Sequence, residues 1–139
     1  MLPFLRNRSV RIVERFIEAV NRRDLDGVGA VISDDFRIVD SQGEWLEGRE
    51  EVLRAHARFF ELEPNFNLSA ESKVARGDEV LVKGSVTASD PSLALDTLWK
   101  ARVAGNKVTY FQSFGPPEAP HLARALAGDA AHPSSESAA

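Results

Sequence analysis

One short segment organises the chain, namely Asp34-Asp35-Phe36-Arg37-Ile38-Val39-Asp40. Side chains alternate along an extended backbone, so Phe36, Ile38 and Asp40 share one face. The two apolar residues predict that this face points into a core, with the Asp40 carboxylate at its inner end. A carboxylate there must accept hydrogen bonds, stay near water or take up a proton. We therefore predict a first strand over about residues 36–41, ending in a candidate functional residue.

The composition is that of a globular domain without cysteine chemistry. The chain has 139 residues, of which 43% are hydrophobic and 27% charged, and this size suits one domain. The net charge of −4 argues against nucleic acid as a partner. No cysteine is present, which excludes disulfides and thiolate ligands. No apolar run approaches the roughly 20 residues that cross a bilayer, so we expect a cytoplasmic protein without a membrane partner.

Apolar residues at helical spacing predict three helices in the first half of the chain. Residues 1–8 are expected to be an irregular lead-in, with Ser9 as the N-cap of a helix over residues 10–21. Asp24 is expected to cap a second helix over residues 25–32. A third helix is predicted over residues 49–62, followed by Pro64.

After Pro64 the apolar period changes from helical to alternating. It predicts strands over residues 66–74, 79–88, 93–103 and 107–114, in addition to a short extended segment at Trp45 and Leu46. Helices followed by antiparallel strands define an α+β protein. We expect a cone-shaped, curved antiparallel sheet covered by three N-terminal helices, with a pocket at its open end.

Residues 116–139 are expected to lie outside the single domain formed by residues 1–115. This tail is rich in Ala, Pro, Ser and Glu. Residues 121–126 can form one or two helical turns, whereas the segment beyond Gly128 has too little apolar surface to offset the entropy of ordering it. The tail is therefore predicted to be largely disordered, and its His121 and His132 are given no role.

Several short motifs resemble, in their order and spacing, the SnoaL-like domains of the nuclear transport factor 2-like superfamily. They are Val13-Glu14-Arg15-Phe16-Ile17-Glu18-Ala19-Val20-Asn21, Asp24-Leu25-Asp26-Gly27, Asp34-Asp35-Phe36, Asp40 with Gly43, Gly48-Arg49-Glu50, Gly77-Asp78-Glu79-Val80 and the hairpin from Gly105 to Phe114. The resemblance covers about residues 9–115. It implies the cone fold and frequent homodimers, but it says little about the reaction, because this fold hosts many chemistries.

Among these families the chain also resembles the ketosteroid isomerases, whose sites shift the pKa values of their carboxylic acids. The resemblance puts Asp40 at the position of their catalytic aspartate. It puts Phe16 and Trp99 where those enzymes have the tyrosine and the protonated aspartic acid of the oxyanion hole, and His56 where they have a second tyrosine. Losing one oxyanion donor typically raises a barrier by about 2.7–4 kcal/mol. We therefore do not expect steroid isomerisation by that mechanism.

Asp40 and His56 are the candidate catalytic residues. Asp40 is interpreted as a general base in an apolar pocket, with His56 as its partner acid or as a donor that positions a carbonyl. For Asp40 an equally weighted alternative is a strand-end aspartate that accepts hydrogen bonds from the turn at residues 41–43. For His56 the alternative is a neutral core histidine bonded to a nearby backbone group.

The expected ligand is a small apolar molecule that undergoes isomerisation, cyclisation or dehydration. The candidate substrate-binding residues are Phe16, Phe60, Trp99, Tyr110 and Gln112. For Phe16 the favoured interpretation is a core residue, with pocket-lining as the alternative, and the placement of Tyr110 and Gln112 depends on the register of the last strand. We find no pattern for a metal or a cofactor. The competing hypothesis is a non-catalytic module that binds a ligand or pairs with a second copy through the outer face of the sheet.

Overall fold

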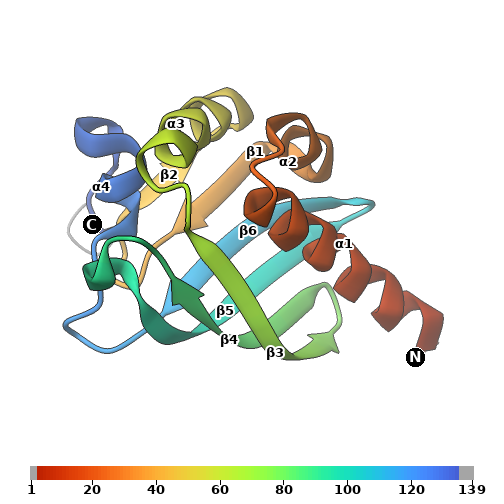
Figure 1. Cartoon of the computed structure of the whole chain (residues 1–139). Coiled ribbons are helices and arrows are strands. Elements are labelled where there is room, and N and C mark those ends of the chain that lie inside the picture. The colour runs from red at the N-terminus through yellow and green to blue at the C-terminus, as the bar shows by residue number, and fades with distance from the viewer. Residues whose placement is uncertain (1–2, 135–139) are drawn as a thin grey trace.

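The computed structural model describes residues 3–134, and it has the expected α+β architecture (Figure 1). Its helices are α1 (Pro3–Asn21), α2 (Leu25–Val31), α3 (Arg49–Leu62) and α4 (Leu122–Ala127), with two short 3-10 turns, η1 (Pro91–Leu93) and η2 (Gly128–Ala130). Its strands are β1 (Ile32–Val39), β2 (Trp45–Glu47), β3 (Asn67–Arg76), β4 (Glu79–Thr87), β5 (Leu95–Ala104) and β6 (Lys107–Phe114).

The six strands form one curved sheet in the order β2-β1-β6-β5-β4-β3. All neighbours are antiparallel except β1 and β6, which run parallel. The sheet is therefore mixed, which corrects the expectation of a purely antiparallel one. Three register shifts, in β1, in β3 and between β5 and β6, interrupt the ladders. Such bulges bend and twist strands, which suits a sheet that wraps around a core.

Two expected boundaries differ from the structure. The first helix begins at Pro3 and includes Ser9, which therefore does not cap it. Proline is compatible with the first turn of a helix, because no intrahelical bond requires its missing N–H. The first strand begins at Ile32, so Asp34 and Asp35 are exposed strand residues and not a turn. By contrast, Asp24 caps α2 as expected and accepts a hydrogen bond from Gly27 N at 3.0 Å.

The described part of the tail packs on the domain, although the sequence predicts it to be largely disordered. Ala119, Ala123 and Leu126 are buried, and α4 lies beside α3 at the end of the sheet away from the N-terminus (Figure 1). The reason is an apolar stripe, because residues one helical turn apart, such as Leu122 and Leu126, project from the same side of α4. No helix in the described range 3–134 is long and apolar enough to cross a membrane.

Candidate functional site

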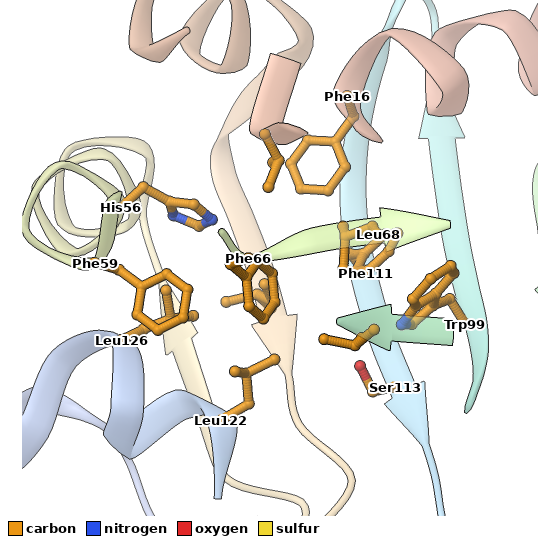
Figure 2. A pocket seen from close by; sticks show the side chains of 13 residues that line it. Phe16, His56, Phe59, Phe66, Leu68, Trp99, Phe111, Ser113, Leu122 and Leu126 are labelled. Atoms are coloured by element: carbon orange, nitrogen blue, oxygen red, sulfur yellow. The ribbon is translucent and has the colours of Figure 1, made fainter. Parts of the chain in front are cut away.

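A small apolar cavity lies between the helices and the inner face of the sheet (Figure 2). Every helix except α2 and every strand except β2 contributes to its wall, and its volume is about 30 Å³. The lining residues are Phe16, Val20, Ile38, His56, Phe59, Phe66, Leu68, Val86, Trp99, Phe111, Ser113, Leu122 and Leu126. Three of these residues, His56, Trp99 and Ser113, carry polar side-chain groups and determine which hydrogen bonds the cavity can offer a ligand.

His56 is the only titratable group in the lining, and its ring points from α3 toward the cavity (Figure 2). Its Nδ1 lies 2.8 Å from the carbonyl oxygen of Val52, one helical turn earlier. A carbonyl only accepts hydrogen bonds, so Nδ1 must carry the proton, and Nε2 keeps a free lone pair. Burial lowers the pKa of His56 below 6.5, against the opposing effect of the Val52 hydrogen bond. The imidazole is therefore neutral near pH 7 and presents an acceptor.

Trp99 and Ser113 provide hydrogen-bond donors on the opposite wall. They are Cα partners on β5 and β6, which places their side chains next to each other on the inner face. The indole nitrogen of Trp99 and the Ser113 hydroxyl both face the cavity (Figure 2). The arrangement thus pairs one acceptor on a helix with two donors on the sheet, separated by apolar space.

The structure places Phe16 and Phe60 differently. Phe16 lines the cavity and is also a core residue, because its ring packs at 5.5 Å from Phe36 and 5.0 Å from Phe111. Phe16 is therefore a core residue whose ring also faces the cavity, and its role in substrate binding stays a prediction. Phe60 does not line the cavity, which corrects its expected role in substrate binding. It packs edge-on against His56 at 5.6 Å and supports that ring from behind.

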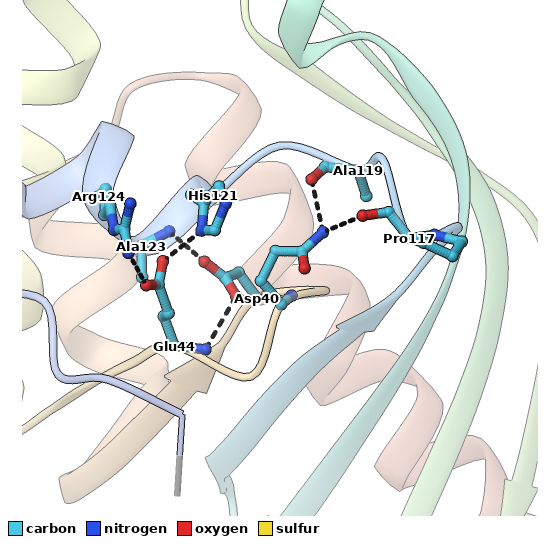
Figure 3. A network of polar contacts seen from close by, with 8 residues as sticks. Asp40, Glu44, Pro117, Ala119, His121, Ala123 and Arg124 are labelled. Atoms are coloured by element: carbon cyan, nitrogen blue, oxygen red, sulfur yellow. Dashed lines mark hydrogen bonds and ion pairs between the residues drawn. The ribbon is translucent and has the colours of Figure 1, made fainter. Parts of the chain in front are cut away.

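Asp40 lies outside the cavity, in the turn between β1 and β2 (Figure 3). Its Oδ1 accepts hydrogen bonds from the backbone N–H groups of Gln42 at 2.9 Å and Glu44 at 3.0 Å. Its Oδ2 accepts from the N–H of Ala123, the second residue of α4, at 3.0 Å. The turn-bonding alternative is therefore the one that the geometry matches, and Asp40 does not line the cavity with His56.

Tyr110 and Gln112 lie on the outer face of the sheet, which corrects their expected role as substrate ligands. Phe111 and Ser113 line the cavity, and alternation along β6 directs their neighbours away from it. The Tyr110 hydroxyl lies 2.7 Å from Gln112 Oε1, and the guanidinium of Arg102 stacks 4.7 Å from the tyrosine ring. Only the register of β6 could have decided between the two faces.

Of the lining residues, sequence reasoning named Phe16, His56 and Trp99 and missed the others, among them Ser113, Leu122 and Leu126. Ser113 follows a buried Phe111 by two positions, so fixing the register of β6 would have found it. Leu122 and Leu126 have helical spacing, and this signal was present within the tail. Among the described residues, no group of three or more His, Cys, Asp or Glu side chains comes together in a way that could hold a metal ion.

Three helices against the concave face of a six-stranded sheet, with a cavity between them, define a nuclear transport factor 2-like fold. The sequence matches the family model of the SnoaL-like domain over residues 13–112. The chain belongs to the SnoaL-like domain family. Comparison with curated protein sequences finds no match.

Solved structures with the same fold include proteins that carry enzyme assignments. An LEH-like epoxide hydrolase from M. tuberculosis is 18% identical with a TM-score of 0.70, covering 86% of this chain and 85% of that one. A Jannaschia sp. CCS1 protein assigned as a SnoaL-like polyketide cyclase is 19% identical with a TM-score of 0.69, covering 91% and 96%. A Kribbella flavida protein assigned as a ketosteroid isomerase is 20% identical with a TM-score of 0.67, covering 79% and 78%. At these identities the likeness shows the fold alone.

Proposed function

We propose that the protein is an enzyme that takes a small apolar molecule into this cavity and moves a proton within it. The reaction class is isomerisation, cyclisation or dehydration. The observation that carries the proposal is the placement of His56 Nε2 opposite the donors of Trp99 and Ser113 in an otherwise apolar cavity. The enzyme assignments of proteins with the same fold support it.

In this proposal His56 is the general base, and Asp40 is not. Nε2 takes a proton from a carbon next to a carbonyl group, and the electron pair of the broken C–H bond moves onto the carbonyl oxygen. The N–H of Trp99 and the hydroxyl of Ser113 stabilise the resulting enolate. The imidazolium then returns the proton to another carbon, which completes an isomerisation without a cofactor. When His56 accepts the proton, it becomes a cation in an apolar site. The negative charge that develops on the adjacent enolate stabilises this cation.

Deuterium exchange tests this base directly. A panel of small apolar ketones is incubated with the protein in D₂O, and loss of the α-proton signals is followed by NMR. We expect His56→Gln to slow exchange by about 10²–10⁴-fold, the usual contribution of a positioned base. Glu61→Gln, on the exposed side of the same helix, serves as the control and should exchange at the wild-type rate. Equal rates for His56→Gln and wild type would remove His56 as the base.

A second candidate function is non-catalytic association through the outer face of the sheet. Leu98 and Phe114 are Cα partners on this face, and each is 41% exposed. The same face carries the ion pairs of Arg37 with Glu47 and of Arg102 with Glu79, so it offers charges of both signs to a two-fold related copy of itself. We propose a homodimer formed by this face, which is compatible with catalysis in the cavity.

A further inference from the structure

The wall of the cavity nearest to the tail is made by two side chains of α4. Leu122 and Leu126 project into the cavity from α4 (Figure 2). The remaining volume, about 30 Å³, has room for little more than a water molecule, which needs about 10–15 Å³. Pockets for drug-sized ligands measure about 300–1,000 Å³. A ligand can therefore enter only if part of the wall moves.

One side of α4 is held by the turn between β1 and β2 (Figure 3). Asp40 Oδ2 accepts from Ala123 N, as described above. The buried Glu44 carboxylate pairs with Arg124 at 2.5 Å and with His121 at 2.7 Å. The side-chain amide of Gln42 donates to the carbonyl oxygens of Pro117 at 2.9 Å and Ala119 at 2.7 Å. We call these three side chains, Asp40, Gln42 and Glu44, the latch.

Besides the packing of its apolar side chains, the described part of the tail has few other attachments. Arg58 of α3 donates to the Leu126 carbonyl oxygen at 3.0 Å. Further along, Trp45 and His132 exchange two backbone hydrogen bonds, and their rings stack at 4.1 Å. A helix of six residues is not stable by itself in water, so α4 persists only while such contacts hold it. Segments with few attachments open locally, without unfolding of the whole domain.

We propose that α4 is a lid on the cavity, that the latch keeps it closed, and that ligands enter when the latch releases. The inference rests on the proposed function, because it takes the cavity to be the ligand site. It gives Asp40 a mechanical role, so replacing Asp40 should ease ligand entry. If Asp40 were catalytic, its replacement would instead abolish turnover and leave ligand entry unchanged.

The first test compares Asp40→Asn with wild type. The asparagine keeps an acceptor for the turn but loses one carboxylate oxygen. We expect backbone amides of α4 to exchange with D₂O at least tenfold faster, and 1-anilinonaphthalene-8-sulfonate to associate at least fivefold faster. The matched control is Asp90→Asn, because the Asp90 side chain also caps its own turn and accepts from Ser92 N at 2.9 Å and from Ser92 Oγ at 2.7 Å. Unchanged α4 exchange, or equal acceleration in α3 and β5, would overturn the lid.

The second test keeps the latch intact and locks the tail. Trp45 and His132 form a mutually hydrogen-bonded antiparallel pair, for which Cα atoms lie about 5.5 Å apart, a distance that a disulfide spans. The chain has no cysteine, so a Trp45→Cys and His132→Cys double variant forms one defined bridge. We expect the dye to associate at least tenfold more slowly with the oxidised than with the reduced form. Equal rates in the two forms would overturn the lid.

These outcomes separate the lid from the proposed reaction. Dye entry and amide exchange do not require the proposed reaction. If both tests support the lid but the protein does not exchange the α-protons of ketones, only the proposed role of His56 is contradicted. If His56→Gln abolishes ketone exchange while the oxidised and reduced double variants admit the dye equally, the base stands and the lid fails.

Discussion

The carboxylate of Asp40 shows how one side chain can join segments that are distant in sequence. Its three hydrogen bonds all come from backbone N–H groups, two in its own turn and one in α4. The positive φ of Gly43 (81°) lets this turn fold back so that Glu44 N reaches the carboxylate. The two turn bonds follow from local sequence, whereas the third depends on a partner 83 residues further on, which periodicity cannot locate.

His56 makes stability depend on pH. Its pKa is lowered by burial in the folded protein and returns to about 6.5 in the unfolded chain. Below that pH the unfolded chain binds more protons at this site, so acidification favours unfolding. We expect the free energy of unfolding to fall as the pH drops below about 6.5, by up to about 1.4 kcal/mol per pH unit from this group alone. Above about pH 7.5 the effect is absent.

Urea unfolding of wild type and His56→Gln, measured between pH 7.5 and 5.5, isolates this effect. Other titrating groups affect both proteins alike. The difference in free energy of unfolding between the two should narrow on acidification. A constant difference would show that the histidine has the same pKa in the folded and unfolded chains.

Gly84 makes room for Trp99. A Cβ atom at this position would lie 2.5 Å from Cζ3 of the indole and would also overlap the carbonyl oxygen of Ser69. Gly84→Ala must therefore displace the indole or the strand, and overpacking of this kind costs about 1–3 kcal/mol. We expect that loss in urea unfolding, with a shift of the Trp99 fluorescence. Ser85→Ala, at the next position of β4, should stay within about 0.5 kcal/mol of wild type.

At the scale of elements, α4 and β3 show where sequence patterns were insufficient. The apolar stripe of α4 was visible, but the surrounding Ala, Pro and Ser suggested disorder, and the burial of Leu126 depends on the shape of the cavity mouth. In β3 the alternation places Val74 on the inner face. A register shift between Ala70 and Ser72 reverses the sides, so Val74 is 60% exposed and Lys73 pairs with Glu14 of α1.

Removing residues 116–139 tests the contribution of the tail. Two leucines of α4 lie against the cavity, and each contributes about 1.5–3 kcal/mol when fully buried. We therefore expect a chain that ends at Gly115 to unfold at clearly lower urea concentration than the full chain. A synthetic peptide of residues 116–134, added in trans, should restore part of this stability. A disordered tail would leave the unfolding midpoint unchanged and the peptide without effect.

At the scale of the whole molecule, the order of elements was sufficient to predict the fold. The bounds of α3 and β6 were predicted from sequence, because a long apolar stripe and a turn before Lys107 define them. The parallel pairing of β1 with β6 was not predicted, because no local pattern records which strand lies beside which. The same limit explains why the face of Tyr110 and Gln112 stayed open until the register of β6 was known.

The proposed homodimer is a property of the whole molecule, and sedimentation can test it. We expect wild type to sediment as a dimer and Leu98→Lys as a monomer, because a charge would be buried without a partner in the centre of the interface. Leu62→Lys is the control, since Leu62 is exposed at the end of α3 and not on the sheet. A monomeric wild type, or a dimeric Leu98→Lys, would contradict this interface.

The parallel β1–β6 pair also bears on how fast the protein folds. Strands β3 to β6 follow one another along the chain and pair with their sequence neighbours, so their contacts are mainly local. The pairing of Ile38 with Phe111 joins two strands across α3 and the whole meander, and such a long loop must close before the contact forms. We expect the transition state for folding to require this closure. Destabilising β1 should then slow refolding, whereas loosening the β3–β4 turn should mainly accelerate unfolding.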